Sequence, residues 1–167
     1  ITRAQLDEPQ PLIADGNDWS ANSITVGGIN VIVIAVYLTN YEKFTGVNLT
    51  KLHQIYNFLR YHRMPFTLMG DFNMEPHEWH DSALLEMFAA AIIKPSAPYT
   101  CQQGKGTLID YFIVHHSIAP LVISANAIMN VPWWPHYGIE LELQLIPGTR
   151  TINTLIAGKK LPKELPP

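Results

Sequence analysis

Residues 29–37 form an almost unbroken apolar run, and this run constrains the fold more than any other stretch of the chain. It reads Ile-Asn-Val-Ile-Val-Ile-Ala-Val-Tyr, and most of its members are β-branched. β-Branched residues favour extended backbone, and a strand that is apolar on both sides needs cover on both faces. The run therefore predicts a central strand of a layered fold. Residues 24–26 and the Gly27-Gly28 pair before it predict a hairpin.

Two later stretches have the pattern of helices. Residues 48–62 carry apolar side chains at the spacing of one helical face, namely Leu52, Ile55, Tyr56 and Leu59. Asn48 is a candidate N-cap for this helix. Residues 74–80 are predicted to form a loop, and residues 81–91 a second helix. That helix would be capped by Asp81 or Ser82 and would turn Leu84, Leu85 and Phe88 inward.

Four further strands are expected. Residues 66–71, 108–114 and 120–128 are rich in β-prone apolar side chains. From Ile139 to Leu145, aliphatic residues alternate with Glu or Gln, which is typical of a strand with one solvated face. The order hairpin, helix, strand, helix and three strands predicts a mixed α/β (α+β) fold with helices outside β-sheet.

The chain of 167 residues is long enough for one domain with a substantial core. We expect that domain over residues 24–146, an irregular N-terminal segment over 1–23 with one short strand at 12–14, and a mobile tail over 147–167. Hydrophobic residues make up 47% of the chain and charged residues 15%, which excludes an intrinsically disordered protein. The single cysteine, Cys101, allows no internal disulfide and is predicted to be a buried apolar residue.

The net charge of −3 argues against a strongly basic nucleic-acid binder but leaves room for a local basic groove. No apolar run is long enough to span a membrane, and no signal peptide is recognisable, so no membrane partner is expected. This favours an intracellular or nuclear protein, although the compartment stays open. The sequence begins with Ile, which leaves open whether the chain is a fragment.

Three polar landmarks stand out against this apolar background. Asp71 and Asn73 follow the strand at 66–69, and in an extended backbone they would face one pocket while Phe72 turns into the core. The alternative is an ordinary Asx-type turn. Asp110 lies within a predicted strand, where an unpaired buried carboxylate is unfavourable, so it must find a hydrogen-bond donor, a cation or a metal. His136 follows a Trp-Trp-Pro corner.

Four segments together resemble the endonuclease/exonuclease/phosphatase superfamily, which includes apurinic endonucleases, pancreatic-type deoxyribonucleases, inositol phosphatases and the endonuclease domains of LINE-type retrotransposons. They are Gly70-Asp71-Phe72-Asn73, Ile109-Asp110-Tyr111-Phe112-Ile113-Val114, Val36-Tyr37-Leu38-Thr39-Asn40, and Trp134-Pro135-His136 before the final strand. The resemblance covers residues 24–145 and is closest in character to the retroelement endonucleases. It implies two β-sheets packed face to face with outer helices, in a four-layer sandwich that is expected to be incomplete at the N-terminus. It also implies Mg²⁺-dependent hydrolysis of phosphate esters, with nucleic acid or a phosphorylated small molecule as partner.

The same resemblance assigns roles to five residues. Asp71 would position and deprotonate the attacking water, and Asn73 would orient that water or the phosphate. His136 would hydrogen-bond a non-bridging phosphate oxygen, and Asp110 would fix its tautomer. Tyr37 would lie near the phosphate, although a tyrosine at the edge of the core fits the pattern nearly as well.

Two departures separate this chain from the family pattern. The family's N-terminal half, which supplies an Asn and the Glu that is the main metal ligand, has no counterpart before residue 24. The Asp that normally precedes the terminal His is Pro135 here. Losing two carboxylates should lower Mg²⁺ affinity strongly, so the metal ligands are unknown and a partial or degenerate copy is expected. The sequence leaves open whether an N-terminal half or a partner chain completes the site.

Two other functions remain open. The chain could be a non-catalytic binding or structural module that keeps the fold. It could also bind zinc, because His77 and His80 have ligand spacing and His115-His116 lie near Asp110. Trp133 and Trp134 are expected to pack at a proline-fixed corner, the alternative being a platform for an unpaired base.

Overall fold

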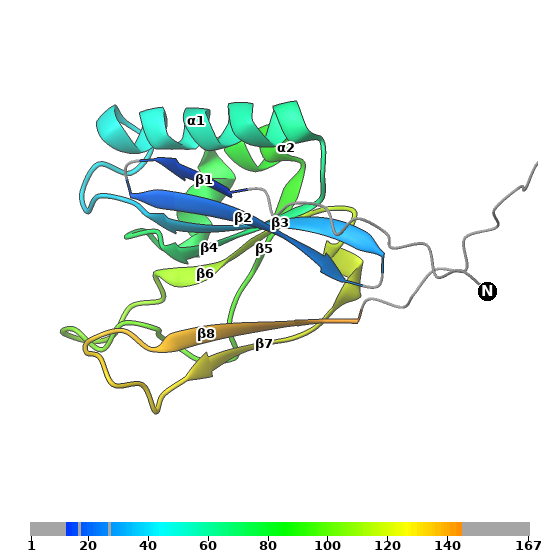
Figure 1. Ribbon diagram of the computed structural model, residues 1–167. Coiled ribbons are helices and arrows are strands. Elements are labelled where there is room, and N and C mark those ends of the chain that lie inside the picture. The colour runs from blue at the N-terminus through cyan, green and yellow to red at the C-terminus, as the bar shows by residue number, and fades with distance from the viewer. Residues whose placement is uncertain (1–12, 17, 27, 145–167) are drawn as a thin grey trace, which may run out of the picture.

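A six-stranded sheet has helices on one face and a two-stranded sheet on the other (Figure 1). The structure is a computed structural model that describes residues 13–16, 18–26 and 28–144. The strands and α-helices are β1 Ile13–Gly16, β2 Trp19–Val26, β3 Ile29–Tyr37, α1 Gly46–His62, β4 Phe66–Asp71, α2 Leu84–Phe88, β5 Ala90–Ile93, β6 Asp110–His115, β7 Val122–Ile128 and β8 Gly138–Leu143. Short 3₁₀ helices occupy Pro76–Asp81 and Ala119–Leu121.

The large sheet has the strand order β1-β2-β3-β4-β6-β5, so the run at 29–37 is a central strand, as predicted. β2 and β3 form the expected hairpin, and β3 pairs in parallel with β4 through the α1 crossover. β4 and β6 are antiparallel, with Asp71 opposite Asp110 in the register. This pairing brings together two strand ends that lie far apart in the sequence.

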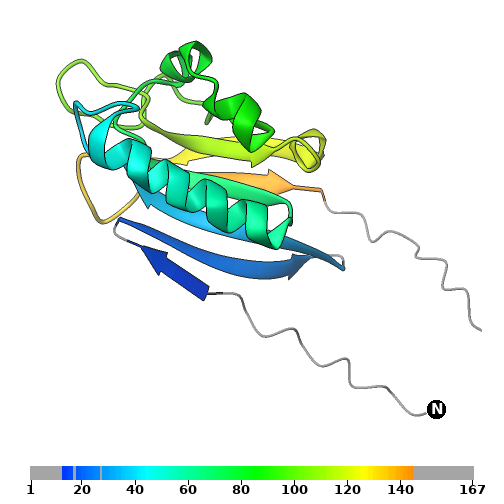
Figure 2. The same ribbon diagram turned by 90° about the horizontal axis from the view of Figure 1, so that it is seen from above.

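The main core lies between the large sheet and α1, which lies along the strands in the view from above (Figure 2). Ile32, Ile34 and Val36 of β3 face Leu52 and other buried side chains of α1. A second core on the opposite face joins β3, β4 and β6 to β7 and β8. This second sheet covers only part of the large sheet, because Ala35 of β3 and its neighbours Ser20 and Asn22 of β2 are exposed.

The fold class is confirmed as a mixed α/β sandwich with two packed sheets, but two expected features differ. The helices form one layer, on the face of the large sheet away from β7 and β8, and the described ranges add no second helical layer to complete four (Figure 1). The segment expected to be irregular contains β1 and the first half of β2, where the polar residues Ser20, Asn22 and Ser23 interrupt any β-prone run. The short strand expected there is β1, of which residue 12 lies outside the described residues, as does the predicted tail at 147–167.

Asn48 is not the N-cap of α1. The helix begins at Gly46 after Thr45, and Asn48 is fully buried within it. Its side-chain amide donates to the Thr39 carbonyl (2.8 Å), and its amide oxygen accepts the Thr39 N–H (2.7 Å). Asn48 therefore pins the loop after β3, a tertiary role that its cap-like sequence context conceals.

The predicted second helix is shorter than its sequence pattern suggests. Residues 76–81 form a 3₁₀ helix with a Glu75/Glu78 capping box, and α2 spans only Leu84–Phe88. Ala89, with φ of 50°, ends the helix and turns the chain into β5, which pairs with β6. A four-residue Ala-Ala-Ile-Ile strand carries no periodicity that distinguishes it from a continuing helix. No helix of the described ranges has the length and apolarity that a membrane span requires.

Candidate active site

Gly70 allows β4 to approach β3 closely just before the candidate catalytic residues. Its φ is +142°, and a Cβ built there would lie 2.0 Å from the Val36 carbonyl oxygen. Only glycine tolerates this conformation and this approach. β4 then ends at Asp71, whose carbonyl accepts the Leu38 N–H at 2.9 Å.

Asp71 and Asn73 form a hydrogen-bonded turn. The Asn73 N–H donates to Asp71 Oδ1 (2.9 Å), while its side-chain Nδ2 donates to Leu38 O (2.8 Å) and Asp71 Oδ2 (3.2 Å). The Asx-type turn is therefore present, and it brings the two side chains into contact, while their sharing of one pocket stays a prediction. The extended geometry expected between them is wrong, since the strand ends at Asp71 and Asn73 has φ of 49°. Phe72 is fully buried, as predicted.

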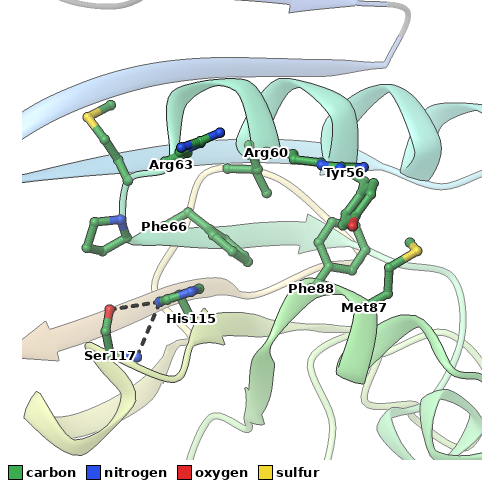
Figure 3. A pocket seen from close by; sticks show the side chains of 11 residues that line it. Tyr56, Arg60, Arg63, Phe66, Met87, Phe88, His115 and Ser117 are labelled. Carbon is green, nitrogen blue, oxygen red and sulfur yellow. Dashed lines mark hydrogen bonds between the residues drawn. The ribbon is translucent and has the colours of Figure 1, made fainter.

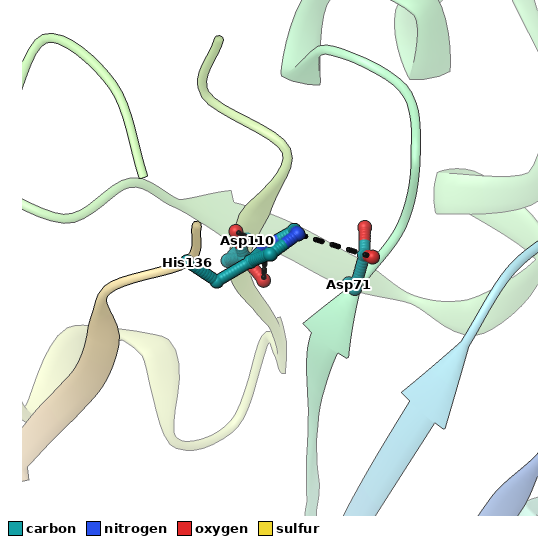
Figure 4. Close-up of side chains that lie close together, drawn as sticks. All are labelled: Asp71, Asp110 and His136. Atoms are coloured by element: carbon teal, nitrogen blue, oxygen red, sulfur yellow. Dashed lines mark hydrogen bonds and ion pairs between the residues drawn. The ribbon is translucent and has the colours of Figure 1, made fainter. Parts of the chain in front are cut away.

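Asp110 has the partner that its burial demands. Its carboxylate lies 2.9 and 3.2 Å from Nδ1 of His136. Since a carboxylate accepts, Nδ1 carries the donated proton, and Nε2 faces Asp71 at 3.9 Å from Oδ2. The imidazole thus lies between two aspartates that come from adjacent strands (Figure 4).

Thr100 supports this arrangement, although no pattern in the sequence marked it. Its buried hydroxyl oxygen accepts the N–H groups of Ile109 (3.1 Å) and Asp110 (2.9 Å). Its carbonyl accepts the N–H of Tyr137 at 2.7 Å. Thr100 therefore ties the start of β6 to the segment that carries His136. Neighbouring Cys101 is buried, as predicted, and forms an isolated β-bridge with His136.

A network of buried aromatic side chains holds the Asp71–Asn73 turn in place. The Phe72 ring stacks on Tyr111, with centroids 4.4 Å apart and planes 18° apart. The Tyr111 hydroxyl accepts from Trp79 Nε1 (2.6 Å) and donates to Met74 O (3.1 Å). Burial raises the pKa of Tyr111 far above its usual range, so its hydroxyl remains a neutral donor. These contacts rigidify the chain on both sides of Asn73.

Burial also raises the pKa of the Asp71 carboxyl above its ordinary value, and the nearby charge of Asp110 adds to this. The Asn73 N–H and the charge of His136 act in the opposite direction without cancelling the effect. A carboxylate with a raised pKa is a stronger base than an exposed one. Asp71 is therefore suited electrostatically to accept a proton.

Tyr37 occupies a neighbouring position but makes different contacts. It ends β3 in register with Asp71, and its half-exposed ring lies 5.6 Å from the Lys51 ammonium. Lys51 is buried, pairs with Asp18 at 2.8 Å and donates to the Tyr37 carbonyl. Within the described part of the chain, no hydrogen bond joins the Tyr37 ring to the two aspartates or the histidine. Its role at a phosphate stays a prediction.

One group of potential metal ligands exists among the described residues. One ligand atom each from Asp71, Asp110 and His136 lies within 4.8 Å of the others. No group in these ranges includes the histidines considered for zinc, His77, His80, His115 and His116, so a zinc site built on them lacks a ligand set.

This donor set fits only a weak Mg²⁺ site. Both oxygens of Asp110 face His136, which leaves Asp71 as the accessible carboxylate, with the amide oxygen of Asn73 beside it. Pro135 supplies no ligand. Proteins often hold Mg²⁺ through one or two carboxylates together with waters and substrate phosphates, and Asp71 can serve in that way.

A cavity of about 380 Å³ opens beside the turn that Asp71 and Asn73 form. It is lined by Asn73, Met74, Ile109 and residues of two surface loops.

Trp133 and Trp134, which precede His136, are 56% and 73% exposed. The expected packing of this pair into the fold is therefore wrong, because more than half of each residue is exposed. An exposed aromatic pair stands next to the candidate catalytic histidine.

No protein-family model and no characterised protein sequence matches the chain. Solved structures do match. The endonuclease domain of TRAS1, a telomere-specific non-LTR retrotransposon, superposes with a TM-score of 0.61 at 12% identity, over 83% of this chain and 71% of that one. An endonuclease/exonuclease/phosphatase family protein from Leptotrichia buccalis gives 0.60 at 15% identity, over 76% and 54%. This chain has the endonuclease/exonuclease/phosphatase fold.

A third solved structure, beta toxin from Staphylococcus aureus, superposes with a TM-score of 0.55 at 14% identity, over 75% of this chain and 57% of the toxin. The chain thus spans just over half the length of two of the three neighbours. At these identities the likeness establishes the endonuclease/exonuclease/phosphatase fold alone. What the site does has to be argued from its own residues.

Proposed function

We propose that this chain is a metal-dependent phosphodiester hydrolase of endonuclease type. The observation that carries the proposal is the meeting of Asp71 with the Asp110–His136 pair where β4 ends beside the start of β6. Hydrolysis of a phosphate ester requires a positioned base for water and a donor for the phosphate, and this cluster offers both. The fold shared with the TRAS1 endonuclease domain supports the same function.

In this proposal His136 binds a non-bridging phosphate oxygen. Its Nδ1–H is committed to Asp110, so Nε2 is the atom left for substrate. Donation to a phosphate oxygen requires a proton on Nε2 as well as on Nδ1, which makes the ring an imidazolium. The cation donates to the phosphate and stabilises the negative charge that develops as water attacks.

Asp71 takes the proton of the attacking water. Burial raises its pKa above the ordinary value, which makes the carboxylate a stronger base, and its two hydrogen bonds from Asn73 hold it in place. The amide oxygen of Asn73 accepts no hydrogen bond in the described part of the chain and can orient the water. A bound Mg²⁺ would supply positive charge that offsets the charge of the phosphate, and Asp71 is the residue that would hold it.

We propose nucleic acid as the substrate. Trp133 and Trp134 are exposed, precede His136 by three and two residues in the chain, and give flat surfaces on which an unpaired base can stack. The net charge of −3 provides no general attraction for the backbone, so we expect binding to be local to the site and weak at physiological salt.

One observation favours a second function, that of a non-catalytic binding module. Pro135 stands where a metal-binding carboxylate would be expected, and Asp71 is the one accessible carboxylate of the cluster. In that case the cluster would hold a phosphate without cleaving it.

Cleavage of supercoiled DNA in Mg²⁺ or Mn²⁺ tests the proposal. We expect Asp71→Asn to lower the cleavage rate by about 100-fold or more, because a positioned general base contributes at least that factor. Asp81→Asn, which makes the same exchange at an exposed position, is the matched control and should cleave at the wild-type rate.

Metal binding has a readout of its own. Mn²⁺ should broaden the Asn73 amide signal in wild type, and Asp71→Asn should abolish this broadening. A folded wild type that binds Mn²⁺ and DNA but shows no turnover would establish the binding module. Equal turnover by wild type and Asp71→Asn would refute the catalytic assignment.

A further inference from the structure

A second cavity, of about 500 Å³, lies at the opposite end of β4 from the candidate active site. It opens between the end of α1, α2, the start of β4 at Phe66 and the end of β6 at His115 (Figure 3). Five residue steps along β4 separate Phe66 from Asp71, roughly 17 Å at the usual rise of a strand. The proposed hydrolysis uses none of the residues that line this cavity.

Its walls are aromatic and apolar. The Phe88 ring packs edge-on against Phe66 and against Tyr56, with centroids 6.1 and 5.7 Å away. Met64 and Met87 complete the apolar lining. Flat rings and flexible thioethers together suit a planar apolar ligand.

Two arginines provide positive charge at the rim. Arg60 lies in the last turn of α1, and Arg63 is its C-cap with φ of 52°. Neither guanidinium has a hydrogen-bond or ion-pair partner among the described residues, and no carboxylate from those residues lines the cavity. The C-terminus of α1 carries a partial negative charge of about half an elementary charge. It offsets only part of the two positive charges of Arg60 and Arg63, so the rim of the cavity remains positive.

The opposite wall provides neutral polar groups. Nδ1 of His115 accepts the Ser117 N–H (3.3 Å) and lies 2.7 Å from the Ser117 hydroxyl. Burial lowers the pKa of His115, and the charge of His116 lowers it further, so the ring is neutral near pH 7. With Nδ1 accepting, Nε2 carries the remaining proton and is a donor. The polar groups that line the cavity are thus suited to an acceptor-rich, negatively charged group.

We propose that this cavity binds a small planar anion, an aromatic ring that carries a phosphate or carboxylate group. The ring lies among Phe66, Phe88 and Met87, and the anionic group pairs with Arg60 and Arg63. Guanidiniums bind phosphate and carboxylate through paired charge-assisted hydrogen bonds. The volume is within the range of small-molecule pockets.

The five methionines of the chain allow a site-specific test by NMR of ¹³C-labelled methyl groups. Met64 and Met87 line the proposed pocket, Met74 lines the cavity beside the candidate active site, and Met69 and Met129 line neither. The probes are AMP, which joins an aromatic ring to a phosphate, and 2-naphthoate, which joins one to a carboxylate. Adenosine, which has the ring without the phosphate, and inorganic phosphate, which has the anionic group without the ring, are the controls. Comparing the affinities of AMP and naphthoate shows whether the pocket prefers a phosphate or a carboxylate.

We expect AMP, naphthoate or both to shift the Met64 and Met87 signals saturably. Adenosine and phosphate should bind at least about tenfold more weakly than the better of the two. Arg60→Gln and Arg63→Gln should each weaken binding at least about tenfold, whereas Lys105→Gln, the same charge change on an exposed loop, should not.

Three results would overturn the proposal. The first is shifts centred on Met74, which would place the ligand at the candidate active site. The second is equal affinity for adenosine or phosphate and the better of AMP and naphthoate, or for the arginine variants and wild type. The third is no shift with any probe at about millimolar concentration. None of these readouts depends on hydrolysis, so the pocket and the proposed activity can fail independently.

Discussion

Replacing Gly70 with alanine tests the geometry on which the candidate active site depends. A Cβ at this position would lie 2.0 Å from the Val36 carbonyl oxygen and 3.0 Å from its carbon, both backbone atoms of the paired strand. Because neither atom belongs to a flexible side chain, β3 and β4 would have to separate. The φ of +142° adds strain of about 1–3 kcal/mol for any residue with a Cβ. With the steric clash included, we expect Gly70→Ala to lower the free energy of unfolding by at least about 3 kcal/mol, a large part of the stability of a domain.

Gly104→Ala is the matched control for this substitution. Gly104 also has positive φ, at +65°, but a Cβ there would meet no atom within 4 Å. Gly104→Ala should therefore lower the free energy of unfolding only by the strain of the left-handed backbone conformation, about 1–2 kcal/mol. Urea unfolding of both variants measures the difference. Equal losses for Gly70→Ala and Gly104→Ala would show that β4 does not approach β3 closely at Gly70, and Asp71 would then not lie where the cluster requires it.

Two further predictions concern the groups around the cluster. Thr100→Val leaves the N–H groups of Ile109 and Asp110 without their acceptor and should lower the free energy of unfolding by about 1–3 kcal/mol, whereas Thr100→Ser should restore most of it; urea unfolding of the pair decides this. Because burial raises the pKa of native Asp71 above its unfolded value, its carboxyl favours the folded state at low pH and loses that contribution as the pH rises through the native pKa. The stability of Asp71→Asn relative to wild type should therefore increase as the pH rises from below 3.8, and a difference that is flat with pH would contradict the raised pKa.

The central strand and the polar pairs could be predicted because their causes are local or unavoidable. A strand as apolar as β3 has to lie inside a layered fold, and β3 is the third of six strands. A carboxylate such as Asp110 cannot stay buried without a partner, and His136 is that partner. In both cases the physical requirement is severe enough that the sequence alone reveals it.

The residues that sequence reasoning missed act through contacts that the sequence does not encode locally. Asn48 resembles a helix cap, but the loop after β3 needs two hydrogen bonds that only a buried amide supplies together. Thr100 lies in a stretch without periodicity, and its importance follows from two N–H groups at the start of β6. Trp133 and Trp134 are expected to pack against the fold because large aromatic residues usually do, yet the described fold covers less than half of each.

The solvent exposure of Asp71, Asp110 and His136 agrees with the different roles proposed for them. Asp110 is the most shielded, with 10% of its side chain exposed, and this suits a group that orients His136 without meeting substrate. Asp71 at 20% and His136 at 28% are open enough to meet water and phosphate, but shielded enough for their charges to act strongly. A purely structural ion-pair cluster at a strand end would gain nothing from leaving its central imidazole the most exposed of the three. The gradient therefore favours a site that receives a ligand over one that merely stabilises the fold.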